Sequence, residues 1–189
     1  MINNPHPWAT SLDTLQAHVW ALLVRGVKDR RASAHHMTLA TVTPGGVPAA
    51  RTVVLRAASK ETASLDVHTD VHAGKVKDLQ TTPFAAIHIW DTSAHLQIRL
   101  GAKVTILTGD EVATHWARVP DRSRLAYGGT PRTGEPIPDS FAYQKDPDPA
   151  SFVILRLSIT HMDILHLGAQ HRRAYFERAD NWSGQWLVP

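Results

Sequence analysis

Apolar segments of strand length, separated mostly by short turns, constrain the fold of this chain more than any other feature. They are MTLATV (37–42), RTVVLR (51–56), SLDVHTD (64–70), FAAIHIW (84–90), HLQIRLGAKVTIL (95–107), FVILRLSI (152–159), MDILHL (162–167), RAYFER (173–178) and a final short QWLV. Their β-branched and aromatic residues suit a pleated surface, and PGG at 44–46 is typical of a hairpin turn. The longest segment contains Gly101, where we expect a bend.

This order predicts strands that are mostly joined as hairpins, together with a few helices. Alternating βαβ units would give a parallel sheet, whereas hairpins give an antiparallel one. The predicted fold is therefore mainly β, an antiparallel barrel with peripheral helices.

Helices are predicted at a few places only. Ser11 is a suitable N-cap for a helix whose apolar residues recur at helical spacing over 12–27. A short helix is predicted over 72–80. Another begins at a Thr-x-x-Glu capping box formed by Thr108 and Glu111.

The whole chain, 1–189, is of a length that suits one domain with a single core, of which 1–36 is an N-terminal helical segment. Residues 129–150 form a Pro/Gly-rich loop, and a loop of that length is usually functional or disordered. No Gly-rich loop joins a strand to a helix, which disfavours nucleotide binding of the Rossmann or P-loop type.

Composition excludes several classes of function. There is no cysteine, so disulfides, thiolate metal sites and cysteine nucleophiles are ruled out. The net charge of +3 is small and scattered, which argues against nucleic acid as a partner. The first ten residues show no secretion signal, and no apolar run approaches the length of a membrane span, so we expect a cytoplasmic protein without membrane contact.

Arginines outnumber lysines, which fits either a small anionic ligand or an arginine-rich composition. The segment RTVVLR shows why an anionic ligand is considered, because successive side chains of a strand point to opposite faces. One face carries Arg51, Val53 and Leu55, and the other carries Thr52, Val54 and Arg56. A buried guanidinium is costly unless paired, so each face predicts an anionic partner.

Several segments together resemble the pyridoxamine 5'-phosphate oxidase superfamily, and more closely its FMN-binding branch of split barrels. They are RTVVLR, HTD at 68–70, Lys75, Gln97 within LQIR, and HRRAY at 171–175. The resemblance runs from about residue 37 to Pro189. It implies a split barrel, a homodimer, and FMN bound between the two subunits.

The resemblance also implies roles for individual residues. Those implied to bind the flavin are Arg51, Thr52, Val53, Val54, Leu55, His68, Thr69, Lys75, Gln97 and Arg172. Those implied to contact the substrate are Arg56, His115 and Ser123. Arg173, one register away from Arg172, is an alternative for the late arginine. No catalytic residue is named.

Lys75 has support that does not depend on the resemblance. It lies in the first turn of a predicted helix, where backbone amides and the helix dipole favour a phosphate. The residue pattern alone also fits a solvated helix lysine here, and it fits Gln97 as a polar residue at a sheet edge.

The chain departs from the oxidase pattern in both phosphate sites. Ala73 and Gly74 replace the Ser-Arg pair that precedes the flavin-phosphate lysine. Val119 stands where the oxidases place the arginine that binds the substrate phosphate. We therefore expect a poor pyridoxamine 5'-phosphate oxidase, unless Arg118 or Arg122 compensates.

The function expected from the sequence is an FMN-dependent oxidoreductase acting on a small, anionic substrate. The alternative is a non-catalytic split barrel that carries or senses flavin, or that binds haem. The twelve histidines show no metal-binding spacing such as HExxH, so no metal site is predicted.

Overall fold

The computed structural model describes residues 6–189, so the first five residues of the predicted segment 1–36 lie outside the described residues. The helices are η1 (Pro7–Thr10), α1 (Leu12–Lys28), α2 (Gly74–Thr81), α3 (Asp110–Arg118), α4 (Asp121–Arg124), η2 (Pro149–Ser151) and η3 (Arg178–Asp180). The strands are β1 (His36–Val42), β2 (Pro48–Ser59), β3 (Ser64–Asp70), β4 (Phe84–Asp91), β5 (Leu96–Leu107), β6 (Phe152–Leu167), β7 (His171–Glu177) and β8 (Gln185–Leu187).

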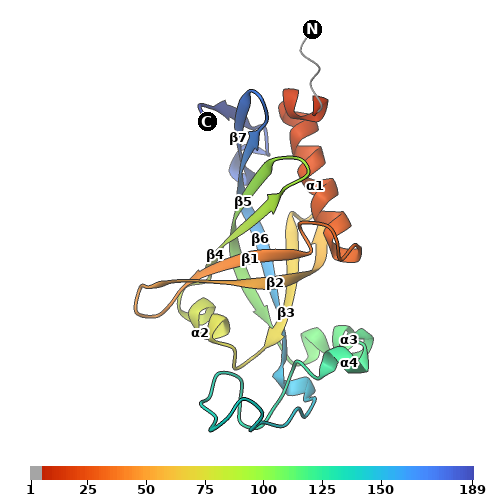
Figure 1. Ribbon diagram of the computed structural model, residues 1–189, viewed down its shortest axis with the longest axis vertical. Helices are drawn as coiled ribbons and strands as arrows, with labels where there is room; N and C mark the ends of the chain where they lie inside the picture. Colours follow the sequence, from red (N-terminus) through yellow and green to blue (C-terminus); the bar gives the residue numbers. More distant parts are fainter. Residues whose placement is uncertain (1–5) are drawn as a thin grey trace.

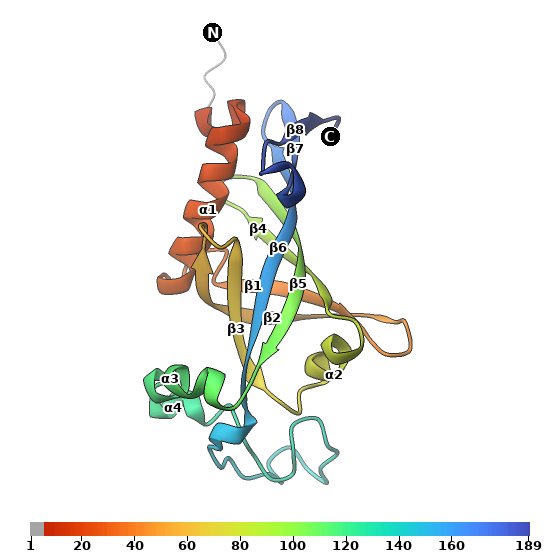
Figure 2. The same ribbon diagram turned by 180° about the vertical axis from the view of Figure 1, so that it is seen from behind.

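One antiparallel sheet curls into a closed barrel. Its strand order is β3-β2-β1-β4-β5-β6-β7-β8, and an additional pairing of β3 with β6 closes six of these strands on themselves. β7 and β8 continue the sheet beyond the barrel, beside the start of α1, while α2, α3 and α4 lie at the opposite end (Figures 1 and 2). The predicted antiparallel split barrel with peripheral helices is confirmed.

The barrel interior follows the two-residue alternation of its strands. Val53 and Leu55 of β2 are buried, whereas Thr52 and Arg56 are exposed, as RTVVLR predicts. Helix α1 begins at Ser11, whose side chain accepts a hydrogen bond from the Thr14 amide at 3.2 Å. The helix buries Leu15, Val19 and Leu23 in the same core as the barrel strands.

A second, smaller core lies under α3 and α4. Its buried members are Val112, Val119, Tyr127, Phe152 and Ile154, with Trp116 packed against them. This cluster packs α3 and Tyr127 against the start of β6.

Two sequence predictions concern the region around Gly101, namely a bend in β5 and two separate strands over 152–159 and 162–167. The β5–β6 register shifts between Gly101 and Ala102, where the sequence predicts a bend. β6, however, is one strand of 16 residues and not two strands. Thr160, between the two predicted strands, forms a β-bulge in β6. Its hydroxyl donates to the Gly101 carbonyl at 3.1 Å.

The capping box predicted for α3 is wrong, because Thr108 is not the N-cap of the helix. The N-cap is Gly109, at φ 58°, and its positive φ explains why a glycine stands there. Glu111 accepts from the Thr108 amide at 3.5 Å, but no cap hydrogen bond comes from a side chain. Within residues 6–189, no helix is both long enough and apolar enough to cross a membrane.

Gly26 generates a testable prediction because α1 touches the following turn there. A Cβ at this position would lie 2.8 Å from the Ala34 Cβ and 2.9 Å from the Ala34 backbone carbon. We expect Gly26→Ala to lower the free energy of unfolding by about 1–3 kcal/mol, because overpacking against backbone outweighs the gain in helix propensity. Urea denaturation measures it.

Gly74→Ala is the matched control for this substitution. Gly74 is also helical, but a Cβ there would meet nothing within 4 Å. The free energy of unfolding should therefore be unchanged or slightly higher. Equal unfolding free energies for the two variants would contradict the close packing at Gly26.

Candidate functional site

The strands β2 and β3 divide their polar residues between two faces. Leu55 pairs with Val67, so Arg51 and Thr69 share the face of the barrel core. Arg56 and His68 belong to the outward face. The pair His68 and Thr69, which the resemblance assigns together to the flavin, is therefore split between two environments.

The first environment, here called the Lys75 cluster, consists of Thr41, Arg51, Thr69, Lys75 and Asp78. The Lys75 ammonium donates to the Thr69 hydroxyl at 2.8 Å. Arg51 donates to the Thr41 hydroxyl at 2.6 Å and lies 3.4 Å from the Asp78 carboxylate. Thr41 in turn donates to Asp78 at 2.7 Å. The anionic partner that Arg51 requires is thus supplied by α2.

Electrostatics make the Lys75 cluster receptive to an anion. Burial lowers the pKa of Lys75, and the neighbouring Arg51 lowers the pKa further, against an opposing effect of Asp70. A bound phosphate would reverse both effects, because it would restore polar contacts to the ammonium and offset the second cation. Lys75 lies in the first turn of α2, as the sequence predicts.

The second environment, here called the Arg56 pocket, has a cavity volume of about 260 Å³. It is lined by Arg30, Arg56, Ala57, Asp66, His68, His115, Arg118, Val119, Pro120, Ser123 and Tyr127. The three residues implied to contact the substrate, Arg56, His115 and Ser123, are therefore brought together. Of the two arginines that could replace the missing guanidinium at position 119, Arg118 lines the pocket and Arg122 does not.

The inner wall of this pocket is aromatic and uncharged. Burial, and secondarily the charge of Arg56, lowers the pKa of His68 to about 4, so its imidazole is neutral at neutral pH. The His68 ring meets Phe152 edge-on, with centroids 4.9 Å apart. Tyr127 is buried, and that burial raises its pKa, against an opposing effect of the nearby Arg56 charge.

Asp70 connects the two environments. Its carboxylate is buried and accepts from the His72 amide at 2.8 Å and from the Gly128 amide at 2.9 Å. The neighbouring Thr69 binds Lys75, and Gly128 directly follows Tyr127 of the Arg56 pocket. The Lys75 cluster and the pocket wall are thus fixed by adjacent residues of β3.

The remaining residues implied to bind flavin lie elsewhere. Gln97 pairs with Trp90 and Leu165, and Leu165 pairs with Arg173, so these four residues form a row on one face of the sheet. Arg172 pairs with His166 on the opposite face, and its Nη1 is buried without a hydrogen-bond partner in the described structure. This row lies near the start of α1, at the other end of the molecule from α2 (Figure 1).

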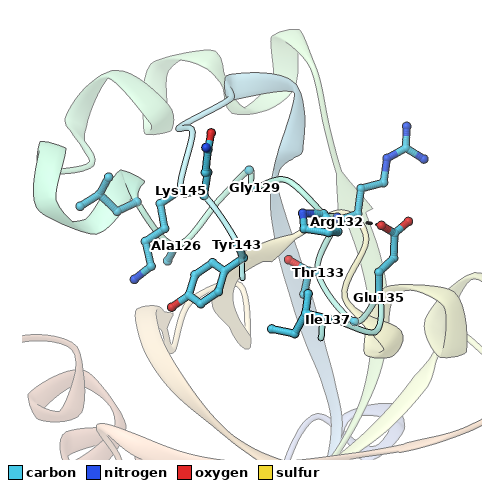
Figure 3. Close-up of a pocket in the computed structure, with 13 residues that line it drawn as sticks. Ala126, Gly129, Arg132, Thr133, Glu135, Ile137, Tyr143 and Lys145 are labelled. Carbon is cyan, nitrogen blue, oxygen red and sulfur yellow. Dashed lines mark hydrogen bonds between the residues drawn. The ribbon is translucent and has the colours of Figure 1, made fainter. Parts of the chain in front are cut away.

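The Pro/Gly-rich loop encloses a separate hollow of about 300 Å³. Tyr143, Lys145 and Ile137 border it, together with the turn from Arg132 to Glu135 (Figure 3). Backbone hydrogen bonds of 3.1 and 2.8 Å between Thr130 and Gln144 close the loop on itself. None of the residues that the sequence predicts for cofactor or substrate lines this hollow.

Sequence reasoning missed Thr41, Asp70, Asp78, Arg30 and Tyr127 at these sites. Asp78 follows Lys75 by three residues on one helix, and i, i+3 spacing could have flagged it. The other four come near the sites only through strand pairing or loop packing.

The neutral state of His68 is directly testable. Because the folded pKa is below the unfolded value of 6.5, the stability contributed by neutral His68 is complete above pH 6.5 and decreases as the pH falls towards 4. We expect an NMR titration of the His68 ring to show a midpoint near pH 4. A His68 midpoint near 6.5 would contradict the burial described above.

Comparisons with known proteins identify the family of this chain. The model of the pyridoxamine 5'-phosphate oxidase FMN-binding domain matches residues 6–108. A pyridoxine/pyridoxamine 5'-phosphate oxidase of Acinetobacter baumannii (strain SDF) is 33% identical over 100 residues, which are 52% of this chain and 45% of that protein. The chain therefore spans about half the length of such curated relatives.

Solved structures extend the likeness to the whole chain. A pyridoxamine 5'-phosphate oxidase-related, FMN-binding protein of Nostoc punctiforme PCC 73102 is 27% identical with a TM-score of 0.77, and 100% of both chains is covered. PhzG of Burkholderia lata 383 is 19% identical with a TM-score of 0.72, covering 100% of this chain and 98% of that one, which shows a shared fold. The chain belongs to the pyridoxamine 5'-phosphate oxidase FMN-binding family.

Proposed function

We propose that the chain is an FMN-dependent oxidoreductase that acts on a small anionic substrate. The observation that carries this proposal is the placement of two cationic sites on opposite faces of the same two strands. The Lys75 cluster would hold the phosphate of FMN, and the Arg56 pocket would hold the substrate.

The residues of the Lys75 cluster fit one phosphate group. Lys75 and Arg51 provide two cations, and Thr41 and Thr69 provide hydroxyl groups beside them. Asp78 engages Arg51, and the only hydrogen bond found for the Lys75 ammonium within residues 6–189 is the one to Thr69. A single monophosphate suits this arrangement, which favours FMN over FAD.

FMN, once bound, would supply the redox chemistry by accepting or donating a hydride, and the protein would supply position and charge. Arg56 would bind the anionic part of the substrate, with Ser123 as a neutral hydrogen-bond partner. Neutral His68 and Tyr127 would form the wall that keeps the substrate in place. Arg118 lines the pocket beside Val119, which supports a role for its guanidinium in place of the missing arginine.

A homodimer follows from the distribution of the implied flavin residues. Lys75 lies in α2 and Thr69 near the end of β3, whereas Gln97 lies at the start of β5 and both late arginines at the start of β7. β7 lies at the other end of the molecule from α2 (Figure 2). One chain does not bring these groups together, so we propose that a site combines the Lys75 cluster of one subunit with the Gln97 row of the other. Arg173 shares the face of Gln97, which favours Arg173 over Arg172 for this contact.

Removing the Lys75 ammonium tests the flavin site. Charge-assisted hydrogen bonds contribute roughly 1.5–3 kcal/mol, so Lys75→Ala should weaken FMN binding by about tenfold or more. Lys77→Ala, on the exposed side of the same helix, is the matched control and should bind FMN normally. Quenching of FMN fluorescence on titration measures both dissociation constants.

Three results would count against this site. The first is equal affinity of the two variants for FMN, and the second is tighter binding of FAD than of FMN. The third is an absorption spectrum of the purified protein that shows haem and no flavin, which would favour a haem-binding split barrel.

Complementation between two defective variants tests the shared site. Neither Lys75→Ala nor a Gln97→Ala, Arg173→Ala double variant should bind FMN well alone. A mixed dimer contains one site with both defects and one with neither, so mixing unfolded chains and refolding them together should restore flavin binding. No recovery, or a flavin-loaded monomer in sedimentation, would contradict the dimeric site.

A further inference from the structure

The Arg56 pocket carries more positive charge than one singly charged anion can offset. Three guanidinium groups line it, from Arg30, Arg56 and Arg118. Arginine does not deprotonate in proteins, so these charges persist at any ordinary pH. The histidine beside Arg56, His68, is neutral and adds no charge.

The acid in the lining does not offset these arginines. Asp66 is bound in bidentate fashion by Arg156, with Arg156 Nε and Nη2 at 3.0 and 2.9 Å from its two oxygens. Among residues 6–189, Arg30, Arg56 and Arg118 take part in none of the ion pairs found. The lining of this cavity of about 260 Å³ is therefore net positive, with guanidinium groups that are exposed to solvent and open to an anion.

Arg30 is held at the pocket by a rigid connection between α1 and β1. The Asp29 carboxylate accepts from the Arg31 amide at 2.9 Å and from Arg25 Nε at 2.8 Å, which fixes the turn on either side of Arg30. Further along, buried His35 bonds the Gly26 carbonyl at 2.7 Å. The His35 carbonyl accepts from the Leu55 amide at 3.0 Å, next to Arg56.

This anchoring has an energetic consequence for binding. A freely moving arginine loses side-chain and loop entropy when it binds a ligand, and a fixed backbone reduces that loss. The turn therefore presents Arg30 to the same cavity as Arg56 before any ligand arrives. Adjacent Arg31 is exposed and does not line the pocket.

We propose that the Arg56 pocket selects a small dianion, and that Arg30 is a specificity-determining residue for it; the inference rests on the proposed function in treating this pocket as the substrate site. A single negative charge would leave two of the three guanidinium groups without an anion. A dianionic phosphate head or two carboxylates would each provide a second negative charge. The small volume favours a metabolite with one ring over a larger ligand.

Calorimetric titration with three probes that share one ring tests this. Phenyl phosphate carries one dianionic head, terephthalate carries two separated carboxylates, and benzoate carries a single charge. At pH 7.5 the wild-type protein should bind at least one of the dianions about tenfold tighter than benzoate, as one additional charged hydrogen-bonding contact implies. The better of the two dianions identifies whether the charges lie on one head or at two ends.

Arg30→Ala should remove most of the preference for the dianion, whereas the matched control Arg31→Ala should keep it. Both residues are exposed, so neither change should alter thermal unfolding. Equal effects of the two substitutions, or equal affinity of wild type for benzoate and both dianions, would overturn the proposal.

Titrations of the apo and FMN-loaded protein separate this inference from the proposed function. If the chain does not bind FMN but the apo protein prefers dianions through Arg30, the flavin proposal fails and the pocket proposal stands. If FMN binds while the dianion preference is absent, the flavin proposal stands and the pocket proposal fails.

Discussion

The pairing of β3 with both β2 and β6 is the constraint on which the rest of the structure depends. β3 pairs with β6 from Ser64↔Ser158 to Asp70↔Phe152, and this ladder closes the barrel. A slip of one residue would exchange the two faces of β3 and move His68 into the core. The pairing with β2 is irregular between Leu55 and Ala57, which lets both Arg56 and Ala57 border the same pocket. The same register therefore forms the core and separates the two sites.

Buried aspartates stabilise the arrangement because each has its donors in place. Asp78 accepts from Thr41 and Arg51, Asp66 accepts from Arg156, and Asp70 accepts two backbone amides. Removing such a partner would leave an uncompensated buried charge, which costs far more than a surface ion pair contributes. These pairs also determine which cationic side chains remain available to bind an anionic ligand. Asp78 partly neutralises Arg51, whereas Lys75 and the arginines of the Arg56 pocket keep their capacity for a ligand.

The sequence predicted the elements well where a pattern repeats and less well where a single contact decides. The two-residue alternation of RTVVLR indicated the two faces of β2, and helical spacing indicated α1 with its Ser11 cap. Strand patterns could not show that Thr160 forms a bulge and not a turn, because that depends on the Gly101 carbonyl across the sheet.

The site residues were likewise predicted where a motif indicated them and missed where a single contact of the fold decides. The resemblance assigned Arg56, His115 and Ser123 to the substrate, and the structure places all three in one pocket. Arg30 was missed because only the fold of the α1–β1 turn places it there. The split of His68 and Thr69 follows from simple alternation, and it was hidden because the pair was taken together as one motif.

The dipeptide Thr69-Asp70 explains how two sites on different faces can be held in a fixed relation. Adjacent strand residues point in opposite directions, so Thr69 reaches Lys75 while Asp70 reaches the Gly128 amide. Gly128 fits because its φ is 91° and because a Cβ there would lie 2.2 Å from the Asp146 carbonyl oxygen. Tyr127, one residue earlier, lines the pocket together with Arg56. A displacement of β3 would move the hydrogen-bond partner of Lys75 and the pocket wall together, and with them the proposed phosphate site and the proposed substrate site. Transfer of a hydride between two bound molecules depends on their relative position more than on any protein acid or base, and a shared rigid strand is a direct physical means of setting that position.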